Sequence, residues 1–175
     1  MKVIKKIIFG ILAVTYFLFV IINTILMLNI NKYGSTQFDD KTFVVIRSEI
    51  SSDKYLKGDL VITKKPKLSE IEIGDEIFVY KIKRDGSPVI DLGIIGDLHP
   101  DNDAISFENG ASYQMDLVLG KTEKIYNNIG HYYGLVQSQW GFLFVILIPS
   151  FLLFIYELYA IIVEIKYGKP EANKK

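Results

Sequence analysis

Cysteine is absent from this chain of 175 residues, and histidine occurs only twice, at His99 and His131. The lack of cysteine excludes disulfide bonds, thiolate metal sites and cysteine nucleophiles. Two histidines offer little for a histidine-rich metal centre, so we expect neither a metal nor a cofactor. Twenty basic residues balance twenty acidic ones. The zero net charge therefore gives no overall electrostatic basis for binding nucleic acid, and we expect no nucleic-acid partner.

Half of the residues are hydrophobic, which is more than an ordinary soluble domain of this length carries and indicates a membrane protein. Residues 7–30 contain no charge. At about 1.5 Å per residue they would span roughly 36 Å, enough to cross a hydrocarbon core of about 30 Å. The block is longer than the apolar stretch of a signal peptide and offers no small-x-small cleavage site, so we predict an uncleaved transmembrane anchor.

A second apolar block covers residues 140–163 and contains one charge, Glu157. Pro149 lies inside it, which spanning helices tolerate better than soluble ones. Glu157 could be an intramembrane functional acid. We favour a side chain that extends to the interface, because it lies close to the polar tail.

Basic residues precede the first block and follow the second, which by the positive-inside rule places both termini in the cytoplasm. The segment between the blocks would then lie outside it. The predicted organisation is a cytoplasmic N-terminus at 1–6, spans at 7–30 and 140–163, an extracytoplasmic domain at 31–139 and a cytoplasmic tail at 164–175.

The central segment has the alternation of β-strands, with runs of β-branched and aromatic residues. We predict strands near 43–47, 60–64, 76–83, 88–95, 104–108 and 117–126. Turn dipeptides separate the runs, namely Gly58-Asp59, Gly74-Asp75, Asp85-Gly86, Gly96-Asp97 and Asn109-Gly110. No apolar helical stripe of ten or more residues interrupts them. The predicted fold class is an all-β extracytoplasmic domain, a folded sheet or barrel, flanked by two transmembrane helices.

Several short motifs occur in a fixed order along the chain. They are Gly58-Asp59-Leu60-Val61, Gly74-Asp75-Glu76-Ile77-Phe78-Val79, Gly93-Ile94-Ile95-Gly96-Asp97, Asp103 to Gly110, and Gly134 to Phe142 followed by Ile148-Pro149-Ser150. Together they resemble elements of the type I signal peptidases, above all the archaeal, endoplasmic-reticulum and spore-former branch. The resemblance implies a membrane-bound serine endopeptidase that removes secretory signal peptides outside the cytoplasm.

The catalytic motifs of that family match poorly. The family spacing from Gly58 back to the nucleophile ends at Ile50, between Ser48 and Ser51, which are the candidate nucleophiles. The family base is a lysine or a histidine. The two branches place it at Val89 and Asp91 here, and neither residue is basic. An aspartate is too weak a base unless it is strongly desolvated. The dyad is therefore expected to be incompetent.

Other ionisable residues could supply a base or a ligand. Lys81 and Lys83 are expected to be ordinary exposed lysines. His99 is expected in a turn, and His131 is expected to pack with neighbouring tyrosines at the interface. The acidic segment from Asp97 lacks the glycine that a calcium-binding EF-hand loop needs, so we expect a solvated turn.

Three functions stay open. The chain could be a divergent signal peptidase, a catalytically degenerate relative, or an unrelated β module of an envelope assembly. The expected partners are signal peptides of secretory precursors, an active peptidase or translocation machinery, and membrane lipid.

Overall fold

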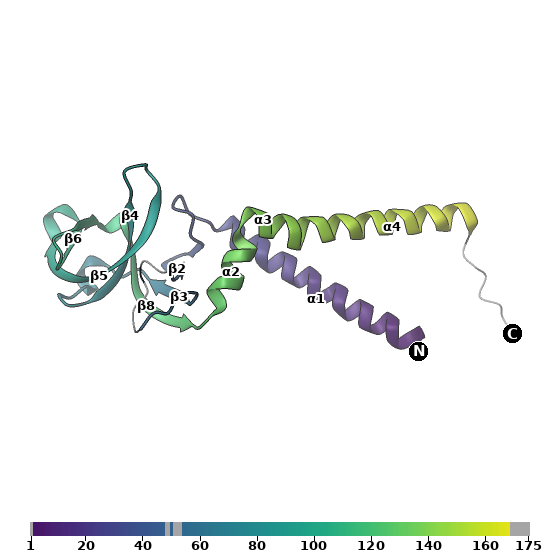
Figure 1. Cartoon of the computed structure of the whole chain (residues 1–175), viewed down its shortest axis with the longest axis horizontal. Helices are drawn as coiled ribbons and strands as arrows, with labels where there is room; N and C mark the ends of the chain where they lie inside the picture. The colour runs from purple at the N-terminus through teal and green to yellow at the C-terminus, as the bar shows by residue number, and fades with distance from the viewer. Residues whose placement is uncertain (1, 48–49, 51–53, 169–175) are drawn as a thin grey trace. The chain divides into compact units, whose positions relative to one another are not determined.

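The computed structural model describes residues 2–47, 50 and 54–168. The chain divides into two compact units, Met1–Gly134 and Leu135–Lys175. The first unit contains a long apolar helix and a β-sheet, and the second contains the helical C-terminal part of the chain (Figure 1).

Helix α1 (Lys2–Leu28) begins the first unit, and its segment Gly10–Leu28 is long and apolar enough to cross a membrane. Three polar side chains near its end bond to the helix itself. Asn23, Thr24 and Asn29 each donate to the carbonyl four residues earlier, at 2.8, 2.8 and 2.7 Å. These bonds satisfy polar groups that would otherwise be costly in an apolar environment.

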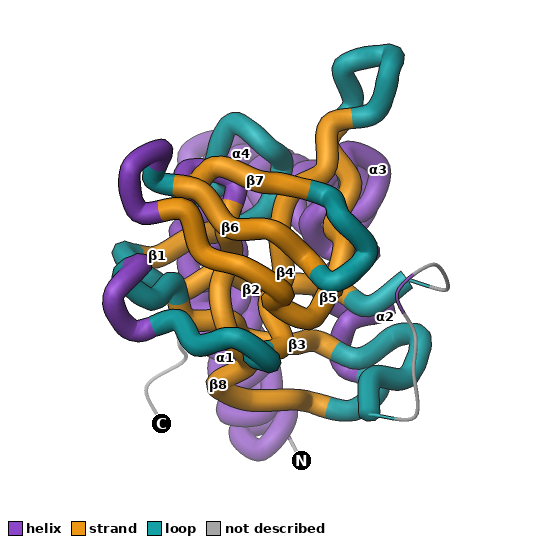
Figure 2. The backbone as a smooth tube through the Cα atoms, turned by 90° about the vertical axis from the view of Figure 1, so that its left-hand side faces the viewer, coloured by secondary structure: helices purple, strands orange, loops and turns teal. Residues whose placement is uncertain are grey.

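The strands that the structure describes after α1 form one antiparallel sheet in the order β1-β2-β3-β8-β4-β5-β6-β7. The strands are β1 (Gln37–Phe38), β2 (Lys41–Val45), β3 (Leu60–Lys64), β4 (Glu76–Ile82), β5 (Pro88–His99), β6 (Ala104–Phe107), β7 (Ser112–Gln114) and β8 (Val118–Tyr126). Short 3₁₀ turns are η2 (Leu68–Glu70), η3 (Pro100–Asn102) and η4 (Met115–Leu117). The sheet curls into a half-barrel (Figure 2), so the prediction of a folded β-sheet between the two apolar segments is confirmed.

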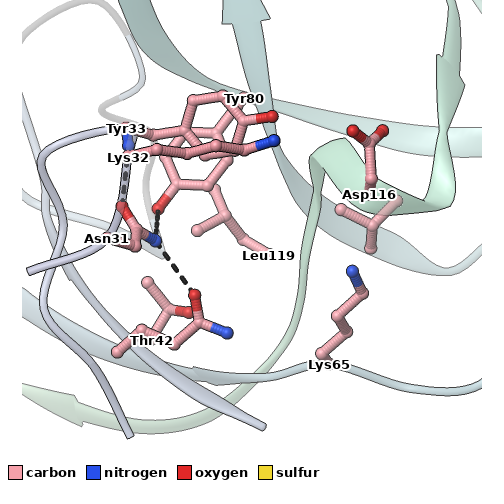
Figure 3. Close-up of a pocket in the computed structure, with 10 residues that line it drawn as sticks. Asn31, Lys32, Tyr33, Thr42, Lys65, Tyr80, Asp116 and Leu119 are labelled. Carbon is pink, nitrogen blue, oxygen red and sulfur yellow. Dashed lines mark hydrogen bonds between the residues drawn. The ribbon is translucent and has the colours of Figure 1, made fainter. Parts of the chain in front are cut away.

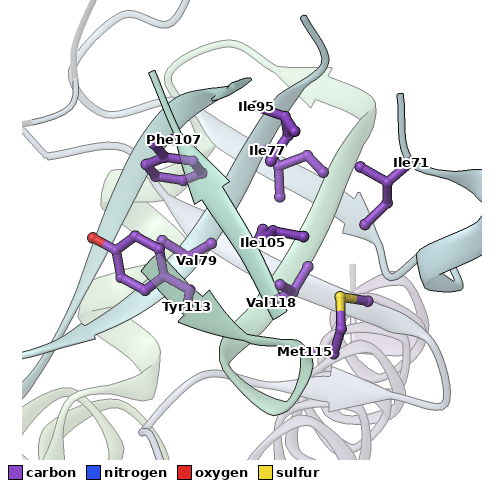
Figure 4. Close-up of a cluster of buried hydrophobic side chains, with 9 residues drawn as sticks. All are labelled: Ile71, Ile77, Val79, Ile95, Ile105, Phe107, Tyr113, Met115 and Val118. Atoms are coloured by element: carbon purple, nitrogen blue, oxygen red, sulfur yellow. The ribbon is translucent and has the colours of Figure 1, made fainter. Parts of the chain in front are cut away.

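Strand β4 is buried on both faces, which explains its unbroken apolar run. Ile77 and Val79 belong to one hydrophobic cluster, drawn in Figure 4, while Phe78 and Tyr80 belong to a second. The first cluster also contains Ile71, Ile95, Ile105, Phe107, Tyr113, Met115 and Val118. The second contains Val44, Ile46, Tyr55, Val61 and Leu119. A strand that separates two cores cannot show a polar face, because successive side chains point to opposite sides.

Two of the Gly-Asp pairs form the same turn. In Leu56–Asp59 and in Glu72–Asp75, the last N–H donates to the first carbonyl, at 3.0 and 3.1 Å. The glycines Gly58 and Gly74 take φ of +93° and +92°, a backbone conformation that other residues adopt only with strain. Each aspartate carboxylate accepts the first N–H of its turn. The motif therefore closes the turn that begins strands β3 and β4.

The third pair, Gly96-Asp97, is not a turn, and that prediction is wrong. It lies inside β5, where the register with β6 shifts between Ile95 and Asp97. A glycine within a strand fits such a bulge, because it adds no side chain where the ladder is irregular.

Asp75 makes the stability of its turn depend on pH. Burial raises the pKa of its carboxyl, but the bond to Lys121, the Glu72 N–H and the Lys121 charge outweigh this and lower the pKa below 3.8. The ionised Asp75 therefore stabilises the folded state fully above pH 3.8, the ordinary pKa of the group, and this stabilisation is lost as the pH falls through the lowered pKa. We expect the Tm advantage of the native chain over Asp75→Asn to shrink below pH 3.8. Thermal unfolding followed by circular dichroism would test this, and a pH-independent difference would contradict it.

A helical region ends the described chain. Helix α2 (Ile129–Gln137) crosses the boundary between the units, and α3 (Gln139–Gly141), the π-helical stretch η5 (Phe142–Leu147) and α4 (Ile148–Tyr167) follow. The segment Phe142–Lys166 is the second one long and apolar enough to cross a membrane. Pro149 is the second residue of α4, and only Ile148 separates it from the π-helical stretch. A proline lacks the N–H of the regular α-helical bond, and helices commonly become irregular near such a residue.

Candidate functional site

The predicted nucleophiles, Ser48 and Ser51, lie outside the described residues. The described residues that flank them are Arg47, Ile50 and Lys54. The structure therefore places the flanks of this loop and the residues around the predicted base, but not the serines.

Asp91 lies on β5 opposite Val79 of β4. Its Oδ2 accepts hydrogen bonds from the Lys81 ammonium at 3.2 Å and from the Tyr113 hydroxyl at 3.4 Å. Lys81 pairs directly with Val89, the other position predicted for the base, so Lys81 and Asp91 are diagonal neighbours across two strands. The predicted base position thus holds an ion pair between β4 and β5.

This ion pair opposes the use of Lys81 as a base. The hydrogen bond to Asp91, followed by the charges of Asp91 and Tyr113, raises the pKa of Lys81. A lysine base requires the opposite, a pKa lowered by burial toward neutrality. The Lys81 side chain is 57% exposed, as the sequence predicted, and its raised pKa keeps it protonated at neutral pH.

Lys54, the first described residue after the predicted nucleophiles, also has a charged partner. Lys54 forms an ion pair with Glu76, and the hydrogen bonds to Glu76 and Tyr55 raise the pKa of Lys54. The fully buried Tyr55 donates to the Glu76 carboxylate at 2.8 Å and shares a hydrogen bond with Thr122 at 2.7 Å. This network fixes the chain immediately after residue 53.

The two histidines occupy different surroundings. His99 ends β5, directly before the turn Pro100–Asn102 rather than within it. Its Nε2 lies 2.8 Å from the hydroxyl of Ser106, which lies 2.7 Å from that of Ser112. His131 is exposed on α2, and its ring packs against Gly58, where a side chain would overlap it. No local sequence pattern predicts either contact, because His131 and Gly58 are distant in the chain and the contact of His99 with Ser106 depends on the register of β5 against β6.

An apolar groove lies on β2, β3 and β8, and we call it the sheet groove. It has a volume of about 450 Å³ and is lined chiefly by Phe38, Phe43, Ile62 and Tyr126. Phe38 and Phe43 meet edge to face at 5.9 Å between ring centroids. Three charged residues, Lys41, Glu123 and Lys124, also line it, and Lys41 pairs with Glu123 at 2.7 Å. Such a surface can hold an apolar segment while its polar rim stays solvated.

A smaller hollow of about 130 Å³, which we call the polar pocket, adjoins the segment that follows α1 (Figure 3). Its wall includes Asn31, Lys32, Lys65, Tyr80 and Asp116. The Asn31 amide donates to the Gln37 side chain and to the Tyr80 hydroxyl, both at 3.0 Å. In the described part of the chain, no group of three or more histidine, aspartate or glutamate side chains could hold a metal ion.

The chain matches no family model, no curated protein and no solved structure.

Proposed function

We propose that this chain is a membrane-anchored, signal-peptidase-like protein that binds apolar segments of secretory precursors without cleaving them. The sheet groove is the observation that carries this proposal. Its four apolar residues come from three adjacent strands and from β1, and they leave a hollow of about 450 Å³ open on the sheet face. The hydrophobic core of a signal peptide has the matching chemistry, since burying apolar surface gains about 25 cal/mol per Å².

The two apolar helices support a membrane location for this function. In the proposed topology both helices cross the bilayer, both termini lie in the cytoplasm and the sheet lies outside it. The lysines before the first apolar segment and in the tail after the second support this orientation. A translocated precursor would then reach the sheet groove on the extracytoplasmic side.

The surroundings of the lysines support the loss of catalysis. A serine nucleophile needs a base that is unprotonated near neutral pH. Lys81 and Lys54, which lie beside the predicted base and beside the predicted nucleophile loop, both have a raised pKa. Loss of general-base assistance alone reduces a rate by about 10²–10⁴.

The test is a combined binding and cleavage assay with the full chain in detergent and a fluorescent signal peptide. We expect the peptide to bind and to remain intact. Phe38→Ala should weaken binding by about fivefold to tenfold, because aromatic anchors carry much of the energy of such interfaces. The matched control is Ile73→Ala, because Ile73 is a 67% exposed apolar residue outside the groove.

Two results would contradict the proposal. Equal peptide affinity of the native chain and Phe38→Ala would exclude the sheet groove as the binding site. Robust cleavage that is abolished by Ser51→Ala or Ser48→Ala would show a working nucleophile, and the proposal of a non-catalytic protein would be wrong.

A further inference from the structure

We propose that the polar pocket binds the phosphate of a phosphodiester, supplied either by a phospholipid head group or by a soluble glycerophosphodiester. The residues that line the polar pocket, which include Asn31, Lys32 and Lys65, carry this proposal. Peptide binding at the sheet groove is not required for it.

Two ammonium groups supply the attraction for an anion. Lys32 and Lys65 line the same pocket, and Figure 3 shows both ammonium groups beside the hollow. Among the described residues, the Lys65 ammonium has no hydrogen bond or ion pair. The Lys32 ammonium lies 4.8 Å from the centroid of the Tyr33 ring. The pocket therefore contains positive charge that is not consumed by ion pairs within this part of the protein.

The wall beside Lys32 already has its polar groups hydrogen-bonded without a ligand. Asn31 donates both amide hydrogens, and its carbonyl oxygen accepts the N–H groups of Tyr33 and Ser35 at 3.0 and 3.1 Å. The Tyr33 and Tyr80 rings pack at 4.3 Å between centroids. Because these groups satisfy one another, ligand binding orders little more than the two lysine side chains, which lowers its entropic cost.

Asp116 determines which ligand charge the polar pocket prefers. Together with Lys32 and Lys65 it gives the pocket a net charge of one positive unit. A phosphodiester carries a single negative charge, whereas a phosphate monoester carries about 1.5 to 2 at neutral pH. The carboxylate repels the additional charge of the monoester, so the pocket should prefer the diester.

The polar pocket lies near the C-terminal end of α1. The Thr36 hydroxyl donates to the Leu26 carbonyl at 3.3 Å, and the Gln37 N–H donates to the Asn29 carbonyl at 2.8 Å. These bonds tie the segment that contains Asn31 and Lys32 to the last turn of α1. If α1 crosses the bilayer, the pocket lies within reach of the phosphate layer.

The test measures dissociation constants for the full chain in an uncharged detergent. The probes are short-chain phosphatidylglycerol, its deacylated product glycerophosphoglycerol, and inorganic phosphate. We expect both diesters to bind better than inorganic phosphate, with binding that weakens as salt rises. Tighter binding of the lipid than of its deacylated product identifies the head group as the source. Equal binding of the two supports the same pocket with a soluble diester as the source.

Charge variants separate binding from structural damage. Lys65→Gln and Lys32→Gln should each weaken diester binding about threefold to fivefold, as expected for partly exposed ion contacts. Asp116→Asn should strengthen binding and reduce the preference for the diester over inorganic phosphate. The matched control is Lys64→Gln, whose ammonium pairs with Asp40 at 3.7 Å outside the pocket. Unchanged binding in both lysine variants, an equal loss in the control, or weaker binding in Asp116→Asn would overturn the proposal.

Discussion

Replacing Gly120 with alanine is expected to destabilise the sheet by about 3 kcal/mol or more, which is large for one added methyl group. Gly120 lies in β8, between β3 and β4, and adopts a φ of +120°. A Cβ there would overlap the carbonyl of Lys64 and would lie 2.7 Å from the Lys65 nitrogen. Both neighbours are backbone atoms of β3 and its following residue, so no side-chain rotation relieves the clash. The strands must separate at the centre of the sheet.

Gly110→Ala is the control that isolates the backbone strain. Gly110 also has a positive φ, +83°, but a Cβ there would meet nothing within 4 Å. This change should cost only about 1–2 kcal/mol, the strain of a left-handed residue. Chemical denaturation of the full chain in detergent, followed by the β-sheet circular dichroism signal, compares the two. Equal losses of stability would show that the close approach of Lys64 contributes nothing.

The positions of the longer strands could be predicted from the sequence. Alternating apolar and polar residues and runs of β-branched residues reflect which strand faces are buried. All six predicted strands are present, and β3 has the predicted bounds, Leu60–Lys64. The strands β1 and β7 were missed, since two or three residues cannot show a period. The prediction ended the fifth strand at residue 95, whereas β5 continues to His99. The reason is that the bulge at Gly96 contains a Gly-Asp pair, and the same pair closes turns before β3 and β4.

Helix α2 could not be predicted from the sequence pattern either. Its nine residues include Gly130 and Gly134, which are poor helix formers. Its start is fixed instead by contacts with a distant turn, since the Gly130 N–H donates to the Gly58 carbonyl at 2.9 Å. Tertiary bonds of this kind override local propensity and cannot be read from the helix residues alone.

The candidate site was predictable only in part for a similar reason. The absence of a basic residue at Val89 and Asp91 follows from the sequence. The ion pair of Asp91 with Lys81 requires the register of β4 against β5, which sets the two as diagonal neighbours. The polar pocket requires more, because Asn31, Tyr80 and Asp116 come from segments far apart in the chain. No local pattern joins them.

The second large effect is expected at Asp59, where alanine should destabilise the β domain by about 3 kcal/mol through the loss of two hydrogen bonds to a charged group. Asp59 is buried, with 2% of the residue exposed. One oxygen accepts the Leu56 N–H at 3.0 Å and the other accepts the Asn128 N–H at 3.0 Å. Alanine leaves both donors without this acceptor, and water has little access to replace it. The turn before β3 and the residues before α2 would lose their shared anchor.

Asp75→Ala is the matched comparison, because Asp75 occupies the same position in the second Gly-Asp turn. Its side chain is 24% exposed, so water can replace part of its bonding to Glu72 and Lys121. The expected cost is about 1 kcal/mol, in the range of an ordinary hydrogen bond. Both variants can be compared by chemical denaturation and by limited proteolysis of the full chain, where Asp59→Ala should expose new cleavage near residues 54–59. If Asp75→Ala costs as much as Asp59→Ala, or if the 54–59 segment stays protected, burial of the Asp59 carboxylate is not what holds this turn to the start of α2.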